Sequence, residues 1–200
     1  MRKILLSLFM CTSLTSCGFM QPVSQPETHR YQISIANSDS NSCSSSGAKM
    51  GMLQVEQMHA LAPYDSKKIF YSTADYELST YAYHQWVADP SQMLSQAVVE
   101  NLLQSCIFDN VIGAEVMSLA KYRLASSLLE LDQKIAGDKS TVNLSILVQL
   151  IDNNSNKVIK SKTFIETMDV AATPSGYTSG VNQATSKFLD DLRAWLIMKG

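Results

Sequence analysis

The 200-residue chain lacks the residue patterns that mark common catalytic and metal sites. Its three histidines, His29, His59 and His84, are scattered, and none has a second ligand at a metal-binding offset. The four cysteines form no Cys-x-x-Cys pair. Neither the Gly-x-Ser-x-Gly elbow of many hydrolases nor a glycine-rich phosphate loop occurs. The sequence therefore predicts a protein that is not an enzyme, with no catalytic residues, no metal ligands and no dissociable cofactor.

The chain is also poor in clustered positive charge and in long apolar runs. Its 16 basic and 18 acidic residues leave a formal net charge of −2, and no basic stripe stands out. Nucleic acid is therefore an unlikely class of partner, and no polybasic patch favours binding to a membrane surface. A transmembrane helix needs roughly 20 consecutive apolar residues, and the N-terminal apolar run is much shorter.

What the N-terminus does contain is a lipobox, Leu14-Thr15-Ser16-Cys17. Two basic residues and an apolar core from Ile4 to Met10 precede it, as in a secretory signal. Thr15 and Ser16 are small, as a signal peptidase requires before its cut, whereas bulky residues precede the rival Cys11. The alternative is an ordinary secretory signal that contains a cysteine by chance. We expect residues 1–16 to be a lipoprotein signal peptide.

Cys17 is then expected to become the first mature residue, with a diacylglycerol on its thiol and an N-acyl chain (palmitate) on its amine. Two or more chains anchor stably, at about 0.8 kcal/mol per buried CH₂. Gly18 occupies the place where an aspartate would favour the inner membrane, so the outer membrane is expected. Residues 17–30 contain glutamine, proline and serine and are expected to form the tether. Residues 31–200 are expected to form a single domain.

Two cysteines remain in the mature chain, Cys43 and Cys106, and the periplasm permits a disulfide between them. Closing so long a loop stabilises by roughly 4 kcal/mol in the chain-entropy model. The alternative is a buried Cys106 on an apolar stretch and a free Cys43 in a polar, serine-rich loop.

The periodicity of apolar residues predicts a series of strands interrupted by two helices. The first helix is expected from Pro90, with Asp89 as its cap, to about Cys106. The second begins at Thr173-Pro174. Strands are expected over 31–36, 52–61, 69–71, 76–86, 111–112, 124–135, 141–152 and 157–167. This order indicates an α+β two-layer sandwich, with a mixed or antiparallel sheet packed against two main helices.

Three short stretches match a known family: Leu61-Ala62-Pro63-Tyr64-Asp65, Ile69-Phe70-Tyr71, and Tyr83 to Pro90 with its Tyr-x-x-Trp motif. They resemble the ABC-type transport auxiliary lipoproteins, which include the PqiC-like lipoproteins. The closing hairpin and long helix of that family resemble residues 142–195. Ser72 and Gln85 stand where the family often has arginine.

The resemblance implies a non-catalytic accessory of a lipid transport system. Its partners would be an ABC transporter permease and ATPase and a lipid-binding MCE-domain protein, which it would dock at the periplasmic face of the outer membrane. It would also be able to form a homo-oligomer. The candidate partner contacts are Pro63, Tyr64, Tyr83 and Trp86, although such aromatics also pack sheet faces. The alternatives are a structural or assembly lipoprotein of another envelope machine, and a lipid-binding carrier.

Overall fold

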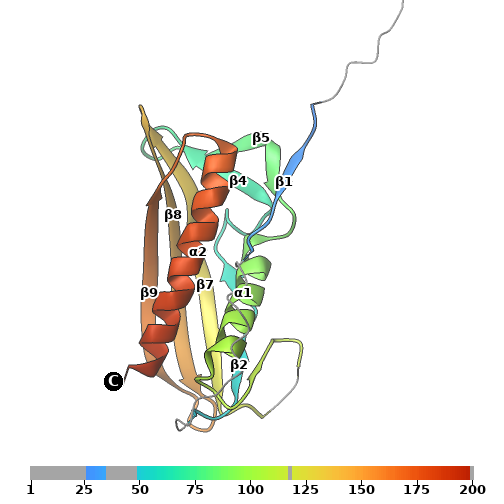
Figure 1. The fold of residues 1–200 in the computed structure, drawn as a ribbon, viewed down its shortest axis with the longest axis vertical. Coiled ribbons are helices and arrows are strands. Elements are labelled where there is room, and N and C mark those ends of the chain that lie inside the picture. The colour runs from blue at the N-terminus through green and yellow to red at the C-terminus, as the bar shows by residue number, and fades with distance from the viewer. Residues whose placement is uncertain (1–25, 35–48, 117–118, 199–200) are drawn as a thin grey trace, which may run out of the picture.

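The computed structural model describes residues 26–34, 49–116 and 119–198. Among these residues, nine strands form one mixed sheet, and two helices lie side by side on one face of it (Figure 1). The expected α+β two-layer architecture is therefore confirmed. The signal peptide, most of the tether, Cys17 and Cys43 lie outside the described residues.

Three long strands form the largest part of the sheet: β7 (Tyr122–Ala136), β8 (Lys139–Asp152) and β9 (Lys157–Asp169). They pair antiparallel in chain order, with Leu131 opposite Leu144 and Ile146 opposite Phe164. These four side chains are buried, so the helices cover this face. Because strand side chains alternate between faces, the neighbouring polar residues point to the other face. A bulge in β7 between Leu128 and Glu130 shifts this alternation by one residue, so that Leu128 and Leu131 both face the helices.

Three short strands line the other edge of β7, and each runs parallel to it. β2 (Leu53–Val55) pairs with residues 122–124, β3 (His59–Ala60) with 127–128, and β4 (Lys68–Ser72) with 132–134. A single strand was expected over 52–61, and this prediction is wrong. Between β2 and β3 the Met58 N–H donates to the Ser95 hydroxyl at 2.7 Å, a bond to the first helix that takes this amide out of the ladder.

The remaining strands extend the two ends of this edge. β5 (Ser79–Trp86) pairs antiparallel with β4, β1 (His29–Tyr31) pairs parallel with β5, and β6 (Val111–Ile112) pairs parallel with β2. A strand was expected over 31–36, but β1 starts inside the expected tether and ends at Tyr31. Beyond it the chain crosses to the helices, where the Ser34 N–H donates to Asn182 Oδ1 at 2.8 Å.

The helices are α1 (Pro90–Ser105) and α2 (Pro174–Ile197), close to the predicted bounds. The Thr173 hydroxyl caps α2 by accepting from the Gly176 N–H at 3.0 Å. The Asp89 side chain makes no such cap on α1, contrary to our expectation. Helix α2 lies very close to the sheet at Gly180, where an added Cβ would sit 2.8 Å from Val142. The core therefore lies between the helices and one face of the sheet.

Candidate docking site

The first candidate contacts lie on the segment that joins β3 to β4. Ala62-Pro63 is a cis peptide, and the Tyr64 N–H donates to the Leu61 carbonyl at 2.8 Å, which forms a tight turn. Pro63 is exposed, whereas Tyr64 is half-buried. The turn sets Tyr64 on the face of the sheet that the helices leave uncovered, so Pro63 is the more accessible member of the pair.

Tyr64 covers a buried carboxyl group that the sequence analysis did not single out. Its hydroxyl donates to Asp132 Oδ2 at 3.1 Å, while Asn143 Nδ2 donates to the other oxygen at 3.1 Å. The ring of Phe70 packs edge-on against Tyr64, with centroids 5.6 Å apart. Burial, followed by the charge of Asp132, raises the pKa of Tyr64 above its usual range. The phenol therefore stays neutral and donates a hydrogen bond to the carboxyl group.

The side chains of Tyr83 and Trp86, both on β5, lie in very different environments. Tyr83 is 47% exposed and remains available to a partner. Trp86 is 1% exposed and packs on Tyr177 of α2, with ring centroids 5.9 Å apart. The expectation that Trp86 contacts a partner is therefore wrong, because the helical layer covers its side chain. Its Tyr-x-x-Trp motif serves to fix β5 against α2.

A polar network joins β5 to the long strands beneath the helices. The Tyr81 hydroxyl donates to Gln133 Oε1 at 2.8 Å, and Gln133 Nε2 donates to the Ser140 hydroxyl at 2.7 Å and the Ala171 carbonyl at 3.1 Å. Gln133 is fully buried, so these bonds satisfy an amide that cannot reach water. Burial also raises the pKa of Tyr81.

Two of the scattered histidines meet at the outer edge of the sheet. His29 on β1 stacks on His84 of β5 with centroids 5.0 Å apart, and the Tyr31 hydroxyl lies 2.9 Å from His84 Nδ1. Desolvation, and then the neighbouring His29, lowers the pKa of His84. Parallel pairing of β1 and β5 brings these residues together, and no local sequence spacing indicates such pairing.

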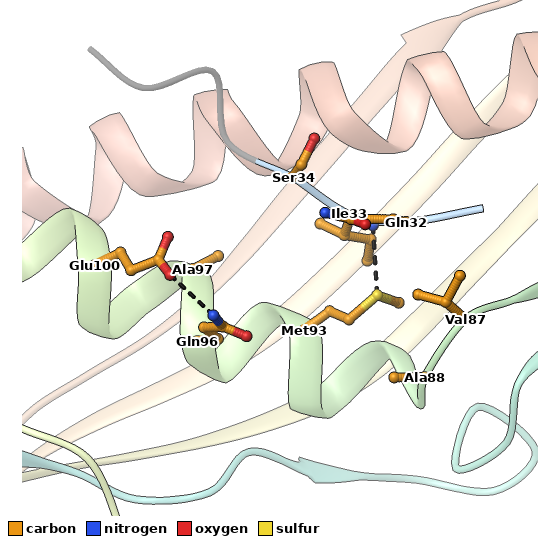
Figure 2. A pocket seen from close by; sticks show the side chains of 9 residues that line it. All are labelled: Gln32, Ile33, Ser34, Val87, Ala88, Met93, Gln96, Ala97 and Glu100. Atoms are coloured by element: carbon orange, nitrogen blue, oxygen red, sulfur yellow. Dashed lines mark hydrogen bonds between the residues drawn. The ribbon is translucent and has the colours of Figure 1, made fainter. Parts of the chain in front are cut away.

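Figure 2 shows a hollow of about 470 Å³ between α1 and the chain that follows β1. The Ile33 N–H donates to the Met93 sulfur at 3.4 Å at its base, and Gln96 Nε2 donates to Glu100 Oε1 at 3.0 Å along its rim. A second hollow of about 430 Å³ lies on the other side of α1 and shares Gln96. Amide and carboxylate groups line both hollows alongside apolar groups. A cavity that binds an acyl chain is expected to have a mostly apolar lining, so neither hollow resembles one.

The described part of the chain has neither a cluster of metal ligands nor a membrane-spanning helix. There, no three His, Cys, Asp or Glu side chains gather closely enough to hold a metal ion. Neither α1 nor α2 has the length and apolar character to cross a bilayer.

Of the expected covalent features, only Cys106 lies within the described residues. It follows α1 with a φ of +58°, is half-buried, and takes part in a disulfide. Because Cys43 lies outside the described residues, its pairing with Cys106 stays a prediction, as does lipidation of Cys17.

These features define a class of protein: a two-layer α+β domain, preceded in the sequence by residues in which a lipobox is predicted. The chain belongs to the family of ABC-type transport auxiliary lipoprotein components, whose model matches residues 31–192. The match covers both helices up to Leu192 and all the described strands from Tyr31 onward.

Solved structures share the fold at low sequence identity. Protein XCC0632 from Xanthomonas campestris is 19% identical, with a TM-score of 0.72 over 84% of this chain and 94% of its own. An uncharacterized protein is 13% identical, with a TM-score of 0.58 over 84% of this chain and 99% of its own. Identities this low establish the fold alone. No curated protein matches the chain.

Proposed function

We propose that this chain is a lipid-anchored, non-catalytic accessory of an ABC transporter that works with an MCE-domain protein to move lipid. The family match over residues 31–192 carries this proposal. The lipobox that ends at Cys17 supports an anchor, and Gly18 supports the outer membrane as its location. In this role the domain docks the lipid carrier at the periplasmic face of that membrane.

Exposed groups on the uncovered face and edge of the sheet support a docking role. Pro63, on the segment between β3 and β4, and Tyr83, on β5, are both exposed. Tyr64, next to Pro63, is held in place by its hydrogen bond to Asp132. A rigid aromatic group held by a buried carboxyl group suits protein recognition, because little side-chain freedom is lost on binding. We propose Pro63, Tyr64 and Tyr83 as partner contacts.

Lipidation is tested by expressing the full chain with Cys17→Ser and, as a matched control, Cys11→Ser. We expect intact-mass measurement of membrane-extracted protein to show cleavage before residue 17 and added acyl chains in the control. The Cys17→Ser variant should retain its signal and carry no lipid. Acylation that persists in Cys17→Ser would refute the anchor.

The partner is tested by crosslinked purification from native membranes, with an affinity tag inserted at the exposed β7–β8 turn between Gly137 and Asp138. Recovery of an MCE-domain protein with its permease supports the proposal, and Tyr83→Ala should weaken that recovery. Dominant recovery of secretin, pilus or barrel-assembly components would favour an assembly lipoprotein instead. Co-purified phospholipid in native mass spectrometry, without protein partners, would favour a carrier.

A further inference from the structure

Strand β9 forms an outer edge of the sheet, and one of its sides is free. Among the described residues β9 pairs only with β8, and Figure 1 shows no element on its other side. It has 13 residues, whereas β1, at another margin of the sheet, has only 3. A long open edge presents unpaired backbone groups and is a template for a further strand.

The pairing with β8 determines which backbone groups point to the free side. The Val170 N–H, directly after β9, donates to the Ser140 carbonyl of β8 at 2.9 Å. The register is regular from residue 160 onward, and backbone groups alternate between the two sides of a strand, so the odd-numbered residues point away from β8. These outward residues are Ser161, Thr163, Ile165, Thr167 and Asp169. Their N–H and carbonyl groups make no hydrogen bond within the described part of the chain.

The usual protections of an open edge are absent from residues 163–169. This stretch contains neither proline nor lysine, and no register shift interrupts it. The two lysines just before it are directed elsewhere. Lys160 donates to carbonyls at the end of α2, and the Lys162 ammonium lies 4.4 Å from the centre of the Phe164 ring on the helical face. Neither lysine therefore projects over this part of the edge.

The side chains of the outward residues favour a further strand. Thr163, Ile165 and Thr167 are β-branched, a property that favours strands. All three are exposed on the face that the helices leave uncovered, and Ile165 is 69% exposed. An incoming strand would therefore meet suitable neighbours and no charged side chain at these three positions.

The sequence of the edge is complementary to itself. A strand that pairs with its own copy about a two-fold axis is antiparallel. With the axis at Ile165, this residue lies opposite itself, and Thr163 lies opposite Thr167 of the second copy. Ser161 likewise lies opposite Asp169. All the outward residues are then paired, with two hydrogen bonds for each pair, and any other position of the axis leaves at least one of them unpaired.

We propose that β9 pairs antiparallel with β9 of a second copy of this chain, about a two-fold axis at Ile165. The two sheets then form one continuous sheet. On the helical face, Lys162 lies opposite Met168 of the second copy and Phe164 opposite Glu166, so no like charges face each other. The inference does not rest on the proposed function.

The position of α2 leaves room for this pairing. Helix α2 packs on β8 at Gly180, beside Val142, and on β9 at Phe188, whose ring centre lies 5.3 Å from that of Phe164. Its axis therefore lies on average between the two strands, and Figure 1 shows most of β9 outside it. The two copies of α2 would be about two strand spacings apart, or roughly 10 Å, which is an ordinary distance between packed helices.

Two lipid-anchored chains can pair in this way on one bilayer. The two-fold axis is perpendicular to the sheet, so the sheet lies parallel to the bilayer when the axis is normal to it. Symmetry then places both copies of β1 at the same distance from the lipid. Residues 17–28, between the expected anchor and β1, span at most about 40 Å when extended.

Cysteine crosslinking tests the position of the axis. The full lipidated chain carries Ile165→Cys, or Ser161→Cys as control, and native membranes are treated with a short bis-thiol reagent. Across the proposed pair the two introduced cysteines have Cα atoms about 5.5 Å apart at position 165 and roughly 27 Å apart at position 161. We expect at least about tenfold more crosslinked dimer from Ile165→Cys.

The wild-type chain controls for reaction of its own cysteines with the reagent. Equal dimer yields from Ile165→Cys and Ser161→Cys overturn the proposal, as does the absence of a crosslinked dimer. Capture mainly of a different protein by Ile165→Cys also overturns it, because another strand would then occupy the edge.

Substitution by lysine tests the same pairing without a reagent. Ile165→Lys places the introduced lysines of the two copies opposite each other and should raise the dimer dissociation constant by about tenfold or more. Ser161→Lys introduces the same residue on the same face of β9, opposite Asp169 of the second copy, and should leave the dimer at least as stable. Both positions are exposed, so each chain should remain folded.

Sedimentation of the full chain in detergent measures the dissociation constants, and circular dichroism checks that each variant is folded. A wild-type chain that sediments only as a monomer overturns the proposal. Equal weakening by Ile165→Lys and Ser161→Lys overturns it as well, because the two-fold axis would not lie at Ile165.

Discussion

The half of the sheet formed by β7, β8 and β9 differs from the half formed by the short strands in how its strands find partners. The long strands have 13 to 15 residues each and are joined by short turns, so they pair with their chain neighbours. The strands from β1 to β6 have two to eight residues, and several pair in parallel with segments far along the chain. The long half therefore forms from contacts between chain neighbours. The short half forms only when β7 is present to pair with its strands.

Besides the backbone pairing of β2, β3 and β4 with β7, buried polar side chains on β7 couple the two halves. On the helical face, Gln133 joins Tyr81 of β5 to Ser140 of β8. On the uncovered face, Asp132 joins Tyr64 to Asn143 of β8. The candidate contacts Pro63, Tyr64 and Tyr83 all lie in the short half. The proposed docking residues therefore belong to the half of the sheet whose strands need β7 for pairing.

The largest expected effect follows from a truncation in the long half. Leu144 is buried on β8 beneath the helices, and Leu144→Ala should lower the free energy of unfolding by about 2–5 kcal/mol through lost burial and a cavity. Leu147 is half-buried on the other face of the same strand, and Leu147→Ala should cost less than about 1.5 kcal/mol. Urea unfolding measures both. Equal losses would contradict a core on one face of the sheet.

Cutting the coupling at Gln133 should have the next largest effect. Gln133→Met preserves volume but leaves the Tyr81 hydroxyl and the Ala171 carbonyl without their bonds, which should cost about 1–3 kcal/mol. Hydrogen exchange should accelerate more in β1, β4 and β5 than in β8 and β9. Gln149→Met, on the uncovered face of β8, serves as control and should change little. Uniform acceleration across all strands would show that the halves do not unfold separately.

The sequence predicts the long half well and the short half less well, because only the long half is encoded by local pattern. Val142, Leu144, Ile146, Val148 and Leu150 alternate with less buried residues, and all five are buried as expected. By contrast, the break between β2 and β3 depends on Ser95, which is 37 residues from Met58. The end of β1 depends on Asn182. A residue so distant leaves no periodic signal at the strand that it interrupts.

The candidate site was predicted in part for the same reason. The resemblance led to Tyr64 and Tyr83, which have surfaces that a partner can reach, and also to Trp86, which is a core residue. Asp132 and Gln133 were missed because a bulge in β7 shifts the alternation just before them. Their burial becomes evident only when β4 and the turn at Tyr64 are placed beside β7.

Removing one hydroxyl at the other coupling point should have a smaller effect. Tyr64→Phe deletes the bond to Asp132 but keeps the ring against Phe70, so the free energy of unfolding should fall by about 1 kcal/mol. Tyr83→Phe, at an exposed ring, is the matched control and should be nearly neutral. If Tyr64→Phe is equally neutral, Asp132 does not hold the turn in place. Thermal unfolding of the purified domain resolves a difference of this size.

The smallest effect concerns pH and lies at the margin of the short half. The pKa of His84 is lowered in the folded protein, chiefly by desolvation and then by His29, so the unfolded chain binds this proton more readily. The contribution of His84 to stability is therefore fully present above about pH 6.5, the unfolded pKa, and is lost as the pH falls through the lower folded pKa. Protonation of His84 would also place a positive imidazole face to face with the ring of His29 where β1 joins β5.

We accordingly expect the melting temperature to fall slightly more between pH 7 and pH 5 in the wild type than in His84→Asn. His59→Asn, at an exposed position on β3, should keep the wild-type slope and controls for the loss of a histidine as such. Hydrogen exchange at Arg30 and Tyr31 should rise over the same pH interval, because β1 is the strand that the stacked pair holds to the sheet. An identical slope in wild type and His84→Asn would mean that the stack contributes no pH dependence. The pairing of β1 with β5 would then depend on pH no more than the rest of the short half does.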